Sequence, residues 1–250
     1  MRTFVLLSAD RMTGVVLVRS GKKYSWHLWR VRTATTSRLI DGVGRVVVER
    51  CDLAPDSGFL VWFVVRPNGG SGAYTFLSTT SPWKTVGAWR HASTHGGGGV
   101  FLGNRTLWMN AKSADVVAEL SPKDVELRFE PGASEFSALF ARLTRTGWVV
   151  ESDQKPYWDT KAGVWIRPMR GGRWMKQSPN GTLRCYYDGA KARWSYALEG
   201  EESLLDGWDW ADWGPDDQLL ASRDRELAVW LPSAREGQAS GTTLQRQIRL

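Results

Sequence analysis

Residues 205–231, LDGWDWADWGPDDQLLASRDRELAVWL, decide the fold of this chain. They place three tryptophans within six positions, then a Gly-Pro-Asp-Asp turn, and then two apolar runs separated by a charged break. In such a turn proline fixes φ, and aspartate accepts hydrogen bonds from the backbone that follows it. A turn, an apolar strand, a short break and a second apolar strand predict neighbouring antiparallel strands of one small sheet.

Poorer copies of this pattern recur along the 250 residues. Three predicted turns share a small residue, a proline and an acid or amide, namely Ala54-Pro55-Asp56, Ser178-Pro179-Asn180 and Gly214-Pro215-Asp216. One residue marks each predicted turn: Gly21, Asp56, Asn104, Thr146, Asn180 and Asp216. These marks divide 195 residues into five intervals with a mean of 39. A four-stranded propeller blade has a period of about 40–45 residues, so the chain is predicted to hold five or six such units.

The opening stretch resembles a blade of the WD-repeat and TolB-type β-propellers. The resemblance rests on Asp209-Trp210-Ala211-Asp212-Trp213-Gly214-Pro215-Asp216, then Leu219-Leu220-Ala221, then Leu227-Ala228-Val229-Trp230. It is best over 205–231, weaker over 50–66 and 176–198, and it lacks the Gly-His dipeptide that precedes each WD repeat. The resemblance implies an architecture and no particular activity, because one fold serves many functions.

The predicted fold class is therefore all-β, with antiparallel four-stranded blades in a small β-propeller of five or six blades and one short helix. An irregular β-sandwich is the alternative. A propeller must hide the edge of its last sheet. We therefore expect the strand over residues 3–8 to close the ring by pairing beside residues 226–231.

Two stretches depart from the β pattern. Residues 134–143 have apolar side chains at the i, i+3, i+4 and i+7 positions of an amphipathic helix. Residues 114–120 are predicted to form one or two helical turns, with Ser113 as the N-cap. The apolar positions of the longer helix are Phe136, Leu139, Phe140 and Leu143.

The chain is predicted to be one cytoplasmic domain over residues 1–232, followed by a polar, flexible tail over residues 233–250. Its N-terminal segment has only four consecutive apolar residues, too few for a signal peptide. No run approaches the roughly 18 apolar residues of a membrane span, so we expect no membrane contact. Cys51 and Cys185 are expected to be free, buried thiols.

The net charge of +7 and the pI of about 9.6 permit binding to nucleic acid or to an acidic protein. The basic residues are dispersed, and no Lys/Arg run marks a dedicated patch. A basic surface that contacts only solvent would therefore account for the net charge equally well.

No motif for catalysis, a cofactor or a metal rises above chance, so we expect no enzyme activity and no cofactor. The run His95-Gly96-Gly97-Gly98-Gly99 lacks the helix and the Lys-Ser/Thr pair of a phosphate-binding loop, and it predicts a flexible hairpin loop. His91 and His95 have no third metal ligand nearby. The acids of the opening stretch lack calcium-loop spacing and predict turn and capping roles. They are Asp206, Asp209, Asp212, Asp216 and Asp217.

The remaining functional feature is the interleaving of tryptophan with basic residues. Exposed Trp and Arg are favoured in protein interfaces, and the same mixture stacks on single-stranded bases or on sugars. Strand alternation, with tryptophan packed on one face and arginine solvated on the other, produces the same pattern. The predicted partner-contact residues are Trp29, Arg30, Trp89, Arg90, His91, His95, Arg170, Arg173, Trp174 and Lys176.

The predicted function is a non-catalytic protein-interaction module, or scaffold subunit, of a cytoplasmic assembly, with another protein as its partner. One alternative is nucleic-acid binding through the basic surface. The other is a carbohydrate-binding or glycoside-processing propeller, in which separated carboxylates carry out acid and base steps.

Overall fold

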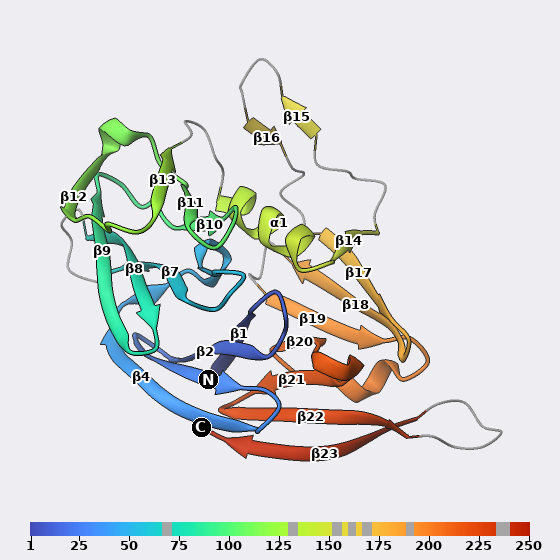
Figure 1. Ribbon diagram of the computed structural model, residues 1–250. Helices are drawn as coiled ribbons and strands as arrows, with labels where there is room; N and C mark the ends of the chain where they lie inside the picture. Colours follow the sequence, from blue (N-terminus) through green and yellow to red (C-terminus); the bar gives the residue numbers. More distant parts are fainter. Residues whose placement is uncertain are drawn as a thin grey trace.

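The computed structural model describes residues 1–66, 72–129, 135–151, 157–159, 164–166, 172–188, 193–233 and 241–250. Within these ranges, five small β-sheets surround one centre, so the chain is a five-bladed β-propeller (Figure 1). The all-β fold class, the helix and the resemblance to propeller blades are confirmed, and the β-sandwich alternative is wrong.

The first sheet follows the chain order and is fully antiparallel. Its strands are β1 (Arg2–Leu7), β2 (Thr13–Ser20), β3 (Lys23–Arg30) and β4 (Thr35–Val43). The second sheet has the order β12-β9-β8-β7-β5, and the short β6 also pairs with β7. Its strands are β5 (Arg45–Val46), β6 (Asp52–Leu53), β7 (Phe59–Val65), β8 (Ala73–Thr80), β9 (Trp83–His91) and β12 (Val116–Leu120).

The third sheet differs from the predicted four-stranded antiparallel blade. It consists of β10 (Gly99–Phe101), β11 (Thr106–Met109) and β13 (Glu126–Phe129), and β11 and β13 pair in parallel. The fourth sheet consists of β14 (Val149–Val150), β17 (Gly172–Ser178), β18 (Gly181–Asp188) and β19 (Arg193–Leu198). The fifth consists of β20 (Trp210–Trp213), β21 (Leu219–Arg223), β22 (Glu226–Ser233) and β23 (Gly241–Arg249). A separate pair is formed by β15 (Tyr157–Asp159) and β16 (Val164–Ile166).

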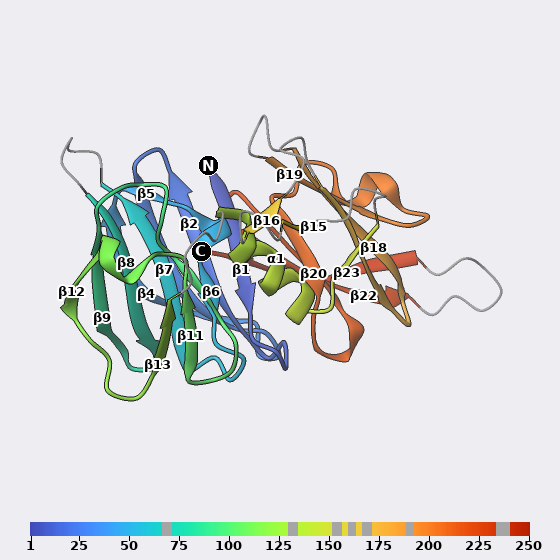
Figure 2. The same cartoon turned by 90° about the horizontal axis from the view of Figure 1, so that it is seen from above.

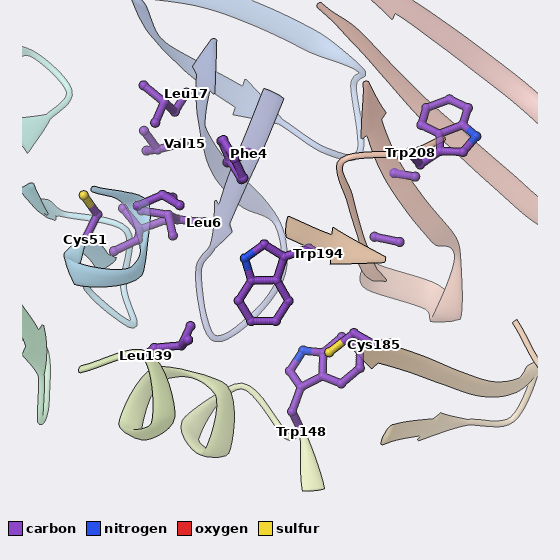
Figure 3. Close-up of a cluster of buried hydrophobic side chains, with 14 of the residues drawn as sticks. Phe4, Leu6, Val15, Leu17, Cys51, Leu139, Trp148, Cys185, Trp194 and Trp208 are labelled. Atoms are coloured by element: carbon purple, nitrogen blue, oxygen red, sulfur yellow. The ribbon is translucent and has the colours of Figure 1, made fainter. Parts of the chain in front are cut away.

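The bulky residues on both faces of β3 are explained by its position between two other sheets. Trp26 faces the second sheet, where its ring lies 6.4 Å from that of Trp62. Trp29 faces the fifth sheet and packs in a cluster with Leu220 and Val229. Eleven tryptophans are buried among the residues whose side chains the structure describes, because inner strands such as β3 have two covered faces. Figure 3 shows part of the central cluster, including Trp148 and Trp194.

The helix α1 (Glu135–Arg145) confirms the predicted amphipathic segment, and Leu139 is buried in the central cluster (Figure 3). At its last turn, Arg145 forms two hydrogen bonds with the Asp52 carboxylate, at 2.6 and 2.7 Å. The same guanidinium donates to the carbonyls of Leu53 and Phe101. The helix therefore ties the second sheet to the third.

The ring closes without the expected pairing of residues 3–8 with residues 226–231. β1 pairs with β2, while β22 pairs with β23. The first and fifth sheets instead meet through Thr3, whose N–H donates to Asp209 Oδ2 at 2.9 Å. The Thr3 carbonyl accepts from Ser222 Oγ at 3.0 Å, and its Oγ1 accepts from the Arg225 N–H at 3.0 Å. Side-chain hydrogen bonds thus replace the expected strand exchange.

The segment expected to be a flexible tail, residues 233–250, contributes a strand to the fifth sheet. β23 pairs with β22 over its length, and Ile248 packs against the cluster between the first and fifth sheets. The polar composition of the tail predicted disorder, but β22 supplies backbone hydrogen-bond partners that composition does not reveal. Residues 234–240 of this stretch lie outside the described residues.

The helical turns predicted over residues 114–120 are also wrong for most of that range. Only Ser113–Asp115 form a short 3-10 turn, and β12 follows as an outer strand. β12 pairs with β9, with Val116 opposite His91 and Val117 opposite Arg90. The tertiary pairing overrides the weak local preference for helix.

The glycine run 96–99 is packed, where the sequence predicted a flexible loop. The Gly98 N–H donates to Thr75 Oγ1 at 2.7 Å, and the buried Arg50 donates to the carbonyls of Thr94 and Gly96. A Cβ on Gly98 would lie 2.3 Å from the Arg50 carbonyl oxygen, at a φ of +76°. Close approach to Arg50 therefore explains why glycine occupies this position.

Substitution Gly98→Ala is expected to lower the free energy of unfolding by about 2 kcal/mol, because alanine meets both the positive φ and the backbone contact. Gly103→Ala is the matched control, since no atom lies within 4 Å of its added Cβ; its effect should stay within about 0.5 kcal/mol. Urea unfolding followed by tryptophan fluorescence measures both, and equal stability of the two variants would contradict the packing role.

Candidate binding site at one end of the propeller

Half of the predicted partner-contact residues are buried. Trp29, Trp89, His91, Trp174 and Lys176 are each at most 3% exposed. Their side chains pack between sheets, as strand alternation allows, and so offer almost no surface to a partner. The prediction that tryptophan supplies contact surface therefore has no support at these positions.

Three of the other predicted contact residues lie in different sheets: Arg30 in the first, Arg90 in the second and Arg173 in the fourth. Arg30, Arg90, His95 and Arg173 are exposed, and Arg90 lies 3.9 Å from Glu119 on the neighbouring strand. Arg170 lies outside the described residues. These exposed side chains remain predicted contact positions.

Among the acids of the opening stretch, Asp212 is buried and paired. Its Oδ1 lies 2.6 Å from Lys176 Nζ and accepts from the Trp213 N–H at 2.7 Å. The Trp148 indole N–H donates to Oδ2 at 3.4 Å. Asp212 therefore joins the fourth sheet to the fifth, a role that turn patterns could not predict.

The neighbouring acids serve turns and ring closure. Asp216 and Asp217 adopt positive φ values of 57° and 54° in the β20–β21 turn, in agreement with the predicted turn role. Asp209 accepts the Thr3 N–H, and burial raises its pKa. Asp212 lines a pocket whose described lining holds no second carboxylate, whereas glycoside hydrolysis needs two.

Seven basic side chains gather at one end of the first, second and fifth sheets. Strand register establishes this: Arg2 lies opposite Arg19, and the Lys22 carbonyl accepts from the Gly44 N–H, which precedes Arg45. Figure 2 shows the N-terminus and β5 along the same edge of the molecule. We call this group the basic rim; it comprises Arg2, Arg19, Lys22, Lys23, Arg45, Arg66 and Arg225.

The charges of the basic rim are close enough to affect one another. Burial lowers the pKa of Arg19, and the positive charges of Arg2 and Arg45 lower it further, against the opposing effect of Glu49. Within the part of the chain that the structure describes, five rim residues form no ion pair: Lys22, Lys23, Arg45, Arg66 and Arg225.

The opposite end of the same sheets has mixed charge. Its turns carry four acids, namely Asp10, Asp56, Asp216 and Asp217, and the Ala9 N–H donates to the Pro55 carbonyl there. Arg32 is paired with Asp216 at 3.4 Å. Seven cations that are dispersed in the sequence thus share one end of these three sheets, where Asp41, Glu49 and Asp224 also lie.

A pocket of about 410 Å³ opens beside the basic rim, between the first sheet and the β21–β22 turn. The inner part of the first sheet packs against the fifth through Val16 and Trp29. Towards the basic rim the side chains on this face become polar. The polar lining consists of Ser20, Lys23, Ser25, Arg38, Asp41 and Arg225.

The polar side chains in and beside this pocket form two hydrogen-bonded pairs. Ser25 Oγ and His27 Nε2 share a hydrogen bond of 2.9 Å. Arg38 donates from Nε and Nη2 to Asp41 Oδ1, at 3.0 and 2.6 Å. Burial lowers the pKa of His27, as do the nearby Arg38 and Arg225, so His27 is neutral near pH 7.

The backbone of Arg225 is unusual for a residue with a side chain. Asp224 and Arg225 have φ values of 42° and 71°, where a two-residue hairpin turn ordinarily places Asn-Gly. The Arg225 N–H donates to the Thr3 hydroxyl oxygen, and the Arg225 carbonyl accepts from the Leu250 N–H. The structure thus accepts backbone strain and keeps a guanidinium at the mouth of the pocket.

The sequence did not reveal this site. Its residues come from positions 2 to 225, and no local run of cations marks them. The one local indication was the turn Asp224-Arg225, which lacks the glycine that such a turn favours. The rest depends on strand register.

Metal clusters and membrane-spanning helices are both absent from the described ranges. Within them, no three His, Cys, Asp or Glu side chains converge so as to hold a metal ion. No helix in the same ranges has the length and apolar character needed to cross a membrane.

No protein-family model matches the chain, and no curated protein matches it. Among solved structures, a chain of a mitotic checkpoint complex is 12% identical, with a TM-score of 0.39, over 99% of this chain and 80% of that one. The RRP9 WD40 repeats are 11% identical, with a TM-score of 0.30, over 100% and 84%. TolB from Acinetobacter baumannii is 8% identical, with a TM-score of 0.29, over 98% and 55%. Similarity this low carries no statement about function.

Proposed function

We propose that this propeller is a non-catalytic protein-interaction module of a cytoplasmic assembly, and that its basic rim binds an acidic segment of a partner protein. The observation that carries the proposal is that five exposed cations, which form no ion pair within the described residues, share one end of three sheets. Complementary charge at an interface raises association rates and favours one orientation of the partner.

The burial of the tryptophans favours a protein over the alternatives. Single-stranded nucleic acids need exposed aromatic rings on which bases stack, and sugars are bound by similar platforms. Trp29, Trp89 and Trp174 lie in the core instead. A cationic rim fits carboxylate side chains, which need charge and hydrogen-bond donors only.

The test is affinity purification from the native host with the wild-type chain and two double variants. Lys22→Glu with Arg45→Glu reverses two exposed charges of the rim. Lys84→Glu with Arg105→Glu makes the same change in net charge at the opposite end, where both side chains are also exposed. We expect the rim variant to lose at least about tenfold of its bound partner, while the control retains it.

Three outcomes would contradict the proposal. If the purified chain is monomeric and no partner is recovered with it, the chain belongs to no assembly. If the rim variant retains the partner, the partner binds at another surface. A partner lost only from the control would move the interface to the end that carries Lys84. Nuclease treatment before elution tests nucleic-acid binding, because it would release a partner that is held only through a bound nucleic acid.

A further inference from the structure

We infer that the pocket between the first and fifth sheets binds a phosphoryl group. Three cations line it, namely Lys23, Arg38 and Arg225, against one carboxylate, Asp41. Its volume of about 410 Å³ lies within the usual range for small-molecule sites. The inference does not depend on the proposed protein partner, since the isolated chain carries the whole pocket.

The donor set favours phosphoryl over carboxylate. Besides the three cations, Ser20 and Ser25 place hydroxyl groups in the lining. A phosphate monoester presents three strong acceptor oxygens and close to two negative charges near pH 7, so it can satisfy more of these donors than a carboxylate with two oxygens. The excess of positive charge in the pocket likewise matches a dianion.

Asp41, the one carboxylate of the pocket's described lining, leaves the positive charge of Lys23 and Arg225 available to a phosphoryl group. Both nitrogens of Arg38 that contact Asp41 point at the same oxygen, Oδ1. The pair orients the Arg38 guanidinium while it neutralises Asp41. Lys23 and Arg225 form no ion pair within the described ranges, so their charges remain available to a ligand.

The strained turn gives the second line of support. Arg225 stays at a φ of 71° although glycine or asparagine would relieve the strain. Two hydrogen bonds, with Thr3 Oγ1 and the Leu250 N–H, hold its backbone in place. These two bonds fix the backbone from which the Arg225 side chain extends to the lining of the pocket.

The experiment titrates the full chain with inorganic phosphate, glucose 6-phosphate and a phosphoserine peptide, and records backbone amide shifts by NMR. Glucose and a glutamate peptide serve as controls without a phosphoryl group. We expect saturable shifts at Ser25, Gly42 and Arg225 with the phosphorylated probes only. Tighter binding of glucose 6-phosphate than of the peptide assigns the site to a small molecule, and the reverse assigns it to a modified protein.

The variant test uses Lys23→Gln with Arg225→Asn, because asparagine tolerates the positive φ and preserves the turn. Each lost charged hydrogen bond should weaken phosphate binding about tenfold or more. Arg30→Gln with Lys84→Gln, at the opposite end, should leave binding unchanged. Absence of saturable shifts at millimolar probe, shifts centred elsewhere, or unchanged affinity in the pocket variant would each overturn the inference.

Discussion

Replacing Lys176 with methionine is expected to lower the free energy of unfolding by about 3–5 kcal/mol, the usual cost of leaving a buried charge without its partner. The Lys176 side chain is 3% exposed and that of Asp212 is 8% exposed, and their charged atoms lie 2.6 Å apart. After the substitution, Asp212 keeps only the Trp213 N–H and the distant Trp148 indole as donors. Two neutral donors stabilise a buried carboxylate less than the ammonium group of Lys176 does.

Thermal or urea unfolding, followed by circular dichroism, measures this loss. The double variant Lys176→Met with Asp212→Asn should recover much of the stability, because the new amide side chain would carry no charge and its oxygen could still accept the Trp213 N–H. Lys84→Met is the surface control, since Lys84 is exposed. A loss below about 1 kcal/mol for Lys176→Met would show that the pair is solvated, and would reopen a chemical role for Asp212.

Lowering the pH from about 6.5 to about 4 is expected to remove about 3 kcal/mol of stability through His91. Burial lowers the pKa of His91 to about 4, and the positive charge of Arg50 contributes. The unfolded chain, whose histidine pKa is near 6.5, binds the proton first. Unfolding therefore becomes easier as the pH falls across this window, and the contribution is complete only above it.

The measurement compares urea unfolding at pH 7 and pH 4 for the wild type and for His91→Gln. Glutamine can still share a hydrogen bond with Thr75 Oγ1, which lies 2.7 Å from His91 Nε2, but it does not titrate. Carboxylates contribute the same acid sensitivity to both proteins, so the difference between them isolates His91. An identical pH dependence in the two proteins would disprove the assignment.

The sequence predicted the local elements of this fold well. Turn residues such as Pro55 and Asn180 mark real hairpins, and the spacing of Leu139 and Leu143 predicted α1. One turn marker was wrong, because Thr146 directly follows the helix and its hydroxyl donates to the Arg142 carbonyl in the last helical turn. These features depend on neighbours within a few positions, which sequence patterns report directly.

None of the described residues predicted as partner contacts belongs to the basic rim or to the pocket beside it. Tryptophan and arginine alternate along β3 and β17, and alternation alone could not show which face is covered. The fifth sheet covers Trp29 and leaves Arg30 at a strand end. Burial thus removes the three tryptophans, His91 and Lys176 from the predicted contact surface, and Arg30, Arg90, His95 and Arg173 stay exposed.

The stretch 205–231 by itself determined that its own residues form neighbouring antiparallel strands, because its turn and strand pattern is local. Only the tertiary structure decided how the ring closes, since Thr3 meets Asp209, Ser222 and Arg225 across more than 200 positions. It also decided where the charge gathers: strand register brings cations dispersed from Arg2 to Arg225 to one end. Register and sheet packing join residues that are distant in sequence, and a one-dimensional pattern carries no record of either.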